Sequence, residues 1–271
     1  MHYIAAAQTD IGNTKAVNQD SLMLKVADTP QGELAYAVLC DGMGGLENGQ
    51  VASAAVVRAY EKWFNEKFVS LFERKALEQE LRRSWYNTLI ECNEKIIRYS
   101  SIHGGDMGTT LTAAIFFNDN YYIMHVGDCR VYEMLDTCEQ LTYDQTFVAR
   151  EVALGHMTSK QALSDPRRNV LLQCVGVNHE VKPDFIQGKV SKGASYLICS
   201  DGFRHELTAK EIYSGCHEKL DVTGEISDKK LTKDSRKSAR LLMEARLNDL
   251  IKINKQRKER DNISAILIKT Y

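Results

Sequence analysis

The sequence predicts an α+β protein in which antiparallel sheets are covered on their outer faces by helices. Short runs typical of strands come in groups, and pairs of long helical patterns separate these groups. This order differs from the regular strand–helix alternation of a doubly wound parallel sheet. No proline-rich or glycine-rich linker divides the 271 residues, so we expect a single domain over residues 1–271.

Eight runs have the composition expected of strands, because they are rich in β-branched and aromatic residues or alternate in polarity. They are Tyr3–Gln8, Ser21–Val26, Leu34–Cys40, Thr110–Phe117, Tyr121–Val126, Arg130–Leu135, Tyr196–Cys199 and Ile263–Lys269.

The spacing of apolar residues between these runs predicts two pairs of helices. The pairs are Val51–Phe72 with Lys75–Ile102, and Ala209–Tyr213 with Ala239–Ile253. Four apolar residues of the last helix fall on one face, as expected of a helix packed on a sheet. They are Met243, Leu247, Leu250 and Ile251.

The segment 144–177 differs from its surroundings. Thr158 and Gln161 have the spacing of a capping box that begins a short helix, and Pro166 ends that helix. We expect a helical insertion between two strands here, and such insertions often lie near functional sites.

The composition excludes several classes of protein. A net charge of −1, with 44% hydrophobic and 26% charged residues, is typical of a globular chain and gives no reason to expect nucleic-acid binding. No apolar run approaches the ~20 residues of a membrane span, and Met1–Ile4 do not begin a secretory signal. Seven cysteines without a C-x-x-C spacing argue against a disulfide framework or a zinc site. We therefore expect a cytoplasmic protein.

Four aspartates stand at the ends of predicted strands. Asp41, Asp128 and Asp201 each follow a strand beside a glycine, and Asp261 directly precedes the last strand. Each one alone is typical of a turn. If the strand ends converge, the carboxylates repel one another unless a proton or a cation lies between them. Oxygen ligands of this kind suit Mg²⁺ or Mn²⁺ better than zinc.

Seven motifs, in order along nearly the whole chain, carry a resemblance to a known family. They are Asp10–Gly12 with Asn18–Asp20, Asp41–Gly45 with Gly49 and Ala52–Ser53, Gly108–Thr110, Val126–Tyr132, Leu141–Asp144 with Gly155 and Pro166–Asn169, Cys199–Gly202, and Asp261–Ser264. The chain resembles the metal-dependent protein serine/threonine phosphatases of the PPM family, which are protein phosphatase 2C-like, and most closely the bacterial branch.

The resemblance implies a four-layer α/β/β/α sandwich of two antiparallel sheets flanked by helix pairs. It also implies two or three Mn²⁺ or Mg²⁺ ions. Asp41 would bridge two ions, and the carbonyl of Gly42 would bind one of these two. Asp201 and Asp261 would be the remaining protein ligands of the second ion. Asp128, together with Asp201, would hold a third ion. Asp20 would orient metal-bound water, which attacks phosphorus. The segment 144–177 corresponds to the part of the family fold called the flap.

Several residues depart from the family pattern. Lys15 stands where the family usually has an arginine that binds the substrate phosphate. The flexible ammonium of lysine therefore replaces a planar guanidinium that can contact two phosphate oxygens. A solvated surface lysine is the alternative. Gln19 replaces a glutamate of the outer shell of ligands, which removes one negative charge. Cys129 replaces a serine and Gln145 a histidine, and the sequence offers no account of Gln145.

The basic segment 229–260 is either a solvated helix face or a docking surface for an acidic partner.

The leading hypothesis is therefore an enzyme that hydrolyses phosphoserine and phosphothreonine in proteins. The resemblance implies phosphoprotein substrates and a bacterial serine/threonine kinase whose action the enzyme counters, and we expect a monomer. A weakly active or non-catalytic phosphatase-like module is the alternative that Lys15 and Gln19 favour. A phosphatase for small metabolites is a third reading, because a fold does not fix the substrate.

Overall fold

The computed structural model describes residues 1–44, 48–71, 77–117, 119–218 and 232–271. Its strands form two antiparallel sheets. The first sheet has the order β1 (Tyr3–Asp10), β11 (Ile263–Thr270), β10 (Ser195–Cys199), β7 (Arg130–Met134) and β8 (Cys138–Gln140). The second has the order β2 (Asp20–Thr29), β3 (Gly32–Gly44), β5 (Leu111–Phe117), β6 (Asn120–Val126) and β9 (Asp184–Lys189), with β4 (Met107–Thr109) beside β3.

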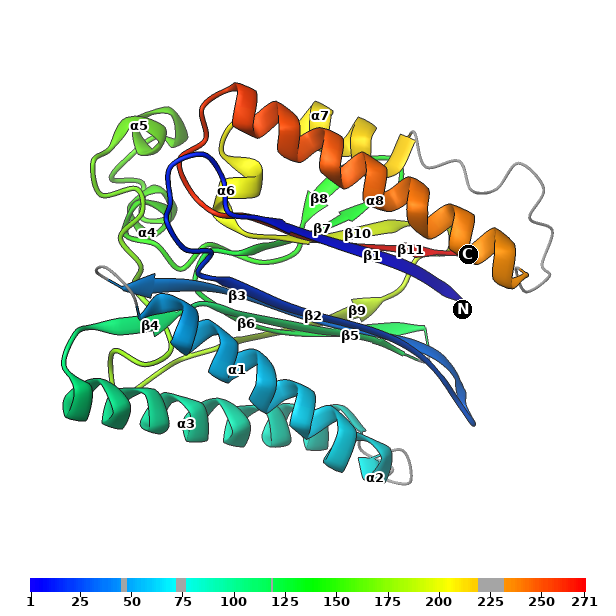
Figure 1. The fold of residues 1–271 in the computed structure, drawn as a ribbon, viewed down its shortest axis with the longest axis horizontal. Helices are drawn as coiled ribbons and strands as arrows, with labels where there is room; N and C mark the ends of the chain where they lie inside the picture. Colours follow the sequence, from blue (N-terminus) through cyan, green and yellow to red (C-terminus); the bar gives the residue numbers. More distant parts are fainter. Residues whose placement is uncertain (45–47, 72–76, 118, 219–231) are drawn as a thin grey trace.

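Helices cover the outer face of each sheet, which gives the expected four-layer sandwich (Figure 1). The second sheet is covered by α1 (Gly49–Trp63), its continuation as a π-helix over Phe64–Phe68 and α2 (Val69–Leu71), and α3 (Leu77–His103). The first sheet is covered by α6 (Asp201–Arg204), α7 (Ala209–Tyr213), a π-helical turn over Ser214–Glu218, and α8 (Lys233–Gln256).

The alternation of side chains along β3 explains how one strand serves two layers. Ala35, Ala37 and Leu39 pack between the two sheets. Tyr36 and Val38 point the other way, toward the helices. Successive side chains of a strand face opposite sides, so a continuous apolar run is what a strand buried on both faces requires.

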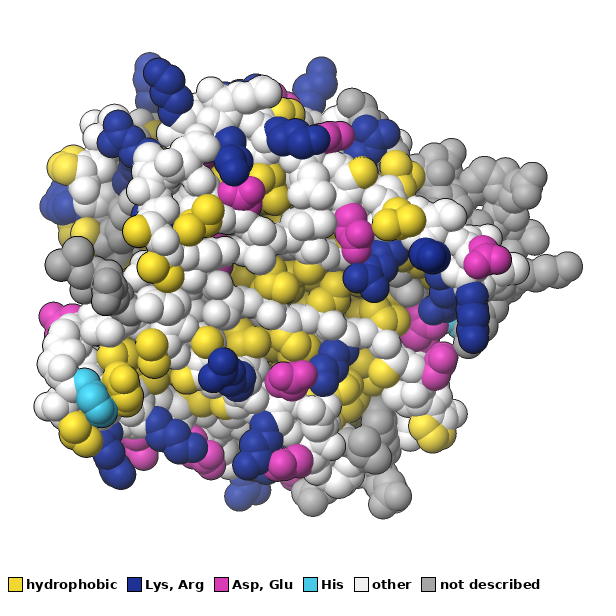
Figure 2. Space-filling model, in the orientation of Figure 1, with side chains coloured by type: hydrophobic (Ala, Val, Ile, Leu, Met, Phe, Trp, Pro, Cys, Tyr) yellow, Lys and Arg dark blue, Asp and Glu magenta, His cyan; other side chains and the backbone are white. Residues whose placement is uncertain are grey.

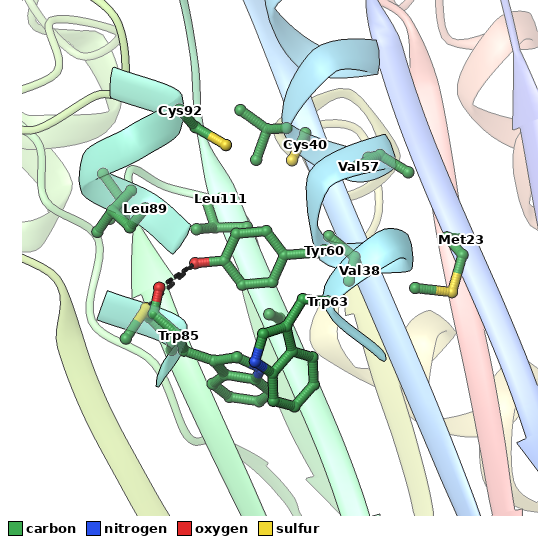
Figure 3. Packing of buried hydrophobic residues seen from close by; sticks show 14 of the residues in the cluster. Met23, Val38, Cys40, Val57, Tyr60, Trp63, Trp85, Leu89, Cys92 and Leu111 are labelled. Atoms are coloured by element: carbon green, nitrogen blue, oxygen red, sulfur yellow. Dashed lines mark hydrogen bonds between the residues drawn. The ribbon is translucent and has the colours of Figure 1, made fainter. Parts of the chain in front are cut away.

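Aromatic residues fill the layer between the second sheet and its helices (Figure 3). The rings of Trp63 and Trp85 meet edge to face with their centroids 5.6 Å apart. The Tyr60 hydroxyl, buried in the same layer, donates a hydrogen bond of 3.0 Å to the carbonyl of Trp85. These contacts join α1 to α3 and fix the pair against the sheet.

All eight predicted strands are present. The sequence did not predict β4 and β8, which are three residues long, or the edge strand β9, which lacks a clear alternation. Phe72 and Lys75, at the ends of two predicted helices, lie outside the described residues. The helix expected after Thr158 is α5 (Ser159–Ser164), and its capping box is formed.

A second short helix, α4 (Phe147–Ala153), precedes α5 in the segment 144–177. Both helices lie at the end of the sandwich where β3 ends (Figure 1). Within the described ranges, no helix combines the length and the apolar character that crossing a bilayer would need.

Candidate functional site

The five aspartates singled out in the sequence come together at one end of the two sheets. Asp41 lies in the last part of β3, and the register of the sheet places Asp20 of β2 directly opposite it. Asp128 follows β6, Asp201 begins α6 after β10, and Asp261 directly precedes β11. The antiparallel pairing of strands far apart in the chain therefore produces the cluster.

A cavity of about 220 Å³ lies at this end, and we call it the acidic cleft. Every predicted site residue except Asp20 lines it. The lining consists of Lys15, Gln19, Asp41, Gly42, Met43, Thr110, Asp128, Asn169, Leu171, Asp201 and Asp261. Asp20 is buried, and its charge acts directly on Asp41.

The carboxylates of the cleft have too few cations and hydrogen-bond donors beside them to offset the cost of their negative charges. Burial, followed by the charges of Asp20 and Asp201, holds the pKa of Asp41 well above its ordinary value. Burial and the neighbouring carboxylates likewise raise the pKa of Asp20 and of Asp128 to about 7. Hydrogen bonds from Ser264 and Ser200 act to lower the pKa of Asp20 but do not outweigh its burial. Within the described residues, Oδ1 of Asp201 has no hydrogen-bond partner. A cation near these groups would offset this cost.

Lys15 reaches into the cleft from the loop between β1 and β2. Its Nζ lies 2.7 Å from Oδ1 of Asp261. Burial acts to lower the pKa of Lys15, but the hydrogen bond and charge of Asp261, with Asp41, outweigh it and the pKa is raised. The side chain is therefore an ion-pair partner in the cleft and not a free surface lysine.

The donor set of the cleft fits a hard divalent cation. It consists of four carboxylates and the carbonyl of Gly42, all oxygen donors of the kind that Mg²⁺ and Mn²⁺ bind. Across the described ranges, no three His, Cys, Asp or Glu side chains already converge at ligand distance from one point. The unpaired Oδ1 of Asp201 supports the fit, because it is buried without a donor.

Gly42 occupies a position where no side chain fits. A Cβ atom there would lie 2.3 Å from the carbonyl oxygen of Gly49 and 2.6 Å from that of Gln19. The Gly42 amide donates to the Gln19 carbonyl at 3.1 Å. The close approach of three backbone segments fixes the carbonyl of Gly42 beside Asp41.

Two threonines fix the backbone of Asp41. The Asp41 amide donates to Oγ1 of Thr110 at 2.8 Å, and the Thr109 hydroxyl donates to the Asp41 carbonyl at 2.9 Å. Cys129 is buried, with its Sγ 3.2 Å from Oγ1 of Thr110. These contacts explain the Gly108–Thr110 motif and give Cys129 a packing role.

The structure supplies the account of Gln145 that the sequence did not. The Gln145 side chain accepts a hydrogen bond of 2.9 Å from the amide of Gly127, and its backbone amide donates to the Gly127 carbonyl at 2.8 Å. His125 contacts the same carbonyl at 3.0 Å. Gly127 has a φ of +107°, so these bonds hold the tight turn that presents Asp128.

Asn262 joins the loop that carries Lys15 to the strand end that carries Asp261. Its Oδ1 accepts a hydrogen bond of 2.9 Å from the Gln19 amide, and its Nδ2 donates to the carbonyls of Ile11 and Val17. An amide side chain can donate and accept at once, which is what this position requires.

Sequence reasoning missed Arg204 and His205, which follow Asp201 by three and four positions. Nη2 of Arg204 lies 3.8 Å from Oδ2 of Asp128 and 3.6 Å from Oδ2 of Asp144. Nε2 of His205 lies 3.5 Å from Oδ2 of Asp201. A helix beginning at Asp201 places residues three and four positions later on the same face, so this spacing was the available signal.

Glu259 is a third residue that the sequence did not single out. Its carboxylate is buried and accepts hydrogen bonds from the amides of Arg260 and Asp261 at 2.7 and 2.8 Å. Its other oxygen lies 3.6 Å from Nδ1 of His205. Burial acts to lower the pKa of His205, but Glu259 and Asp201 outweigh it and the pKa is raised.

The basic segment 229–260 is largely α8, and residues 229–231 lie outside the described part. Three of its cations pair with other elements: Arg236 with Glu33 at 2.6 Å, Lys255 with Asp10 at 2.8 Å, and Arg257 with Glu211 at 2.5 Å. On the face shown in Figure 2, Lys and Arg are interspersed with Asp and Glu.

Comparisons with known proteins agree on one family. The family model described as Protein phosphatase 2C matches residues 10–249. The chain is 31% identical over 211 residues to "Serine/threonine phosphatase stp" of Listeria innocua, covering 77% of this chain and 81% of that one. It is 31% identical over 208 residues to "Serine/threonine protein phosphatase PstP" of Mycobacterium tuberculosis, covering 76% of this chain and 37% of that one.

Solved structures agree with these sequences. The S. agalactiae serine/threonine phosphatase superposes with a TM-score of 0.77 at 25% identity, covering 100% of both chains. The catalytic domain of PstP in complex with two manganese ions superposes with a TM-score of 0.72 at 25% identity, covering 98% of this chain and 97% of that one.

The raised pKa of Asp20 predicts a pH-dependent stability of the metal-free chain. Its pKa rises from an ordinary 3.8 to about 7 on folding, so the folded chain keeps a proton that the unfolded chain releases. The free energy of unfolding therefore falls as pH rises from about 4 to about 7. Asp20→Asn removes this titration, so we expect it to stabilise the chain by about 1–3 kcal/mol at pH 8 and to have little effect at pH 4.

Urea denaturation in EDTA at both pH values measures this difference. Asp106→Asn, at an exposed position, serves as the control and should change stability by less than about 0.5 kcal/mol at either pH. A loss of stability at pH 8 in Asp20→Asn, or an equal effect at both pH values, would contradict the prediction.

Proposed function

Because the chain belongs to the protein phosphatase 2C family and is a protein serine/threonine phosphatase, we propose that it hydrolyses phosphoserine and phosphothreonine by a metal-dependent reaction in the acidic cleft. One observation carries the location: four carboxylates and a lysine from distant parts of the chain line a single cavity. Buried carboxylates of like charge are what a divalent cation site requires.

Asp41, the carbonyl of Gly42, Asp201 and Asp261 would hold two ions, Mn²⁺ or Mg²⁺. Asp128, with Asp201, would hold a third. When bound, such ions supply the positive charge that activates water and stabilises the phosphoryl group during attack on phosphorus.

Two further residues would act on the reacting groups. Asp20, directly opposite Asp41 in the sheet register, would orient the attacking water. Lys15 would contact the substrate phosphate through its ammonium, at the cost of its ion pair with Asp261. Gln19 lines the cleft, and its backbone carbonyl accepts from the Gly42 amide. Its side-chain amide would help to orient water beside the ions.

We also propose the biological setting that the family suggests. The chain would act as a cytoplasmic monomer on phosphoproteins, among them a serine/threonine kinase and its targets. The segment 144–177 would serve as a flap of the single domain 1–271, since its residues Asn169 and Leu171 reach the cleft.

The ion pair of Lys15 favours a second candidate function. An ammonium 2.7 Å from Asp261 competes with a divalent cation for that carboxylate. A chain whose own lysine occupies a ligand would be a weakly active or regulatory phosphatase-like module.

The removal of Asp41 tests the proposed mechanism. We expect hydrolysis of p-nitrophenyl phosphate to require Mn²⁺ and to stop in EDTA. Asp41→Asn should lower the rate by more than about 100-fold, since changes even outside the ligand set commonly cost 10–100-fold. Equal rates in native chain and variant, or activity that persists in EDTA, would contradict the mechanism.

Changes at Lys15 separate its two proposed contacts. Lys15→Met should tighten Mn²⁺ binding, measured by calorimetry, because it frees Asp261 from a competing cation. It should also raise the KM for a phosphopeptide by about tenfold, because a charged hydrogen bond to phosphate is lost. Lys15→Arg should lower KM, because a planar fork can contact two phosphate oxygens. An unchanged KM in both variants would show that Lys15 does not contact the phosphate.

A further inference from the structure

We propose that a pocket beside the acidic cleft binds an apolar side chain of the substrate, close in sequence to the phosphorylated residue. This inference rests on the proposed function and adds a preference for a class of substrate sequence. The pocket has a volume of about 440 Å³, and we call it the flap pocket. Residues of the helices α4 and α5 and of the strands β7 and β8 line it.

The lining of the flap pocket is mostly apolar. α4 contributes Val148 and Val152, and α5 contributes Ala162 and Leu163. A pocket of this size with a predominantly apolar wall is typical of a site that accepts a hydrophobic group.

Two of the three arginines that line the flap pocket are paired with carboxylates of the same pocket, and the third, Arg168, donates to the Leu163 carbonyl at 3.4 Å. Arg130 forms two hydrogen bonds with Asp144, of 2.8 and 2.7 Å. Arg204 lies between Asp144 and Asp128. The guanidinium groups of Arg130 and Arg204 are therefore neutralised by carboxylates, which leaves less positive charge for a second phosphate and favours an uncharged occupant.

The flap pocket adjoins the acidic cleft. Asp128 and Asn169 line both cavities. A residue of extended chain spans about 3.3–3.6 Å, so a peptide whose phosphate lies in the cleft can place a nearby side chain in the pocket.

Two large hydrophobic side chains at the wall of the pocket are unusually exposed. Leu163 is 76% exposed and Tyr143 is 79% exposed. Single exposed apolar residues are common. Here both border the same cavity, beside the proposed site of phosphate hydrolysis, and an apolar group in the pocket would remove them from water.

A set of phosphothreonine peptides tests the inference. One leucine is moved through the three positions on either side of the phosphothreonine in an otherwise alanine sequence, and kcat/KM is measured with Mn²⁺. We expect at least one position to raise kcat/KM by about tenfold over the all-alanine peptide. Leu163→Asp, and Ala162→Phe, which fills the pocket, should bring this ratio close to one.

Leu154→Asp is the matched control, because Leu154 is 59% exposed on the same segment and does not line the pocket. It should keep the leucine preference. All three variants should hydrolyse p-nitrophenyl phosphate at the native rate. A native chain without a leucine preference at any position, or a preference that survives in Leu163→Asp, would overturn the inference.

Peptide binding in EDTA separates this inference from the proposed function. If no substrate is hydrolysed with Mn²⁺, the proposed function fails. Fluorescence anisotropy with labelled leucine and alanine peptides then tests whether the flap pocket binds the leucine side chain. Tighter binding of the leucine peptide that Leu163→Asp abolishes would support the pocket, and equal affinities would overturn it. A native dimer that Leu163→Asp dissociates, without a peptide preference, would show that a second copy covers the pocket and would also overturn the inference.

Discussion

Mutual repulsion among five clustered aspartates, three of them buried, is the constraint on which the site depends. Asp41 is affected by all four of the others, so a charge on one raises the free energy of charging the next. Strand pairing across both sheets holds these groups in place, because Asp20 and Asp41 face each other in register and Asp261 joins β11. The apolar layers that hold the sheets together thus supply the stability that offsets the repulsion at their end.

The protein supplies some positive charge of its own. Lys15 pairs with Asp261, Arg204 approaches Asp128, and His205 approaches Asp201. In the described part of the chain, these contacts still leave Oδ1 of Asp201 without a hydrogen-bond partner. The backbone is held separately from the charges, by Thr110 at Asp41 and by Gln145 at the turn before Asp128. The backbone positions of Asp41 and Asp128 are therefore fixed by bonds that do not involve these cations.

Periodicity along the sequence predicted antiparallel sheets covered by helices, and the family resemblance implied the four-layer order. The predicted strands placed Asp41, Asp128 and Asp201 at strand ends, but the residues alone left open whether these ends converge. The partners of these acids were harder to predict, because Gln145 and Glu259 act on backbone groups whose position only the folded chain defines.

Within the site, the contact of Lys15 was also one that the sequence alone could not predict. The sequence indicated a phosphate contact, but the ion pair with Asp261 depends on the path of the loop between β1 and β2, which Asn262 fixes from the far end of the chain. Short strands such as β4 were missed because three residues contain too little periodicity to be distinguished from a turn.

Anomalous X-ray diffraction from crystals grown with MnCl₂ tests the central claim most directly. The account requires manganese peaks in the acidic cleft, within about 2.2 Å of oxygens of Asp41, Asp201 and Asp261, with the Lys15 ammonium displaced from Asp261. A cleft without manganese at a saturating concentration, with Lys15 still bound to Asp261, would contradict it.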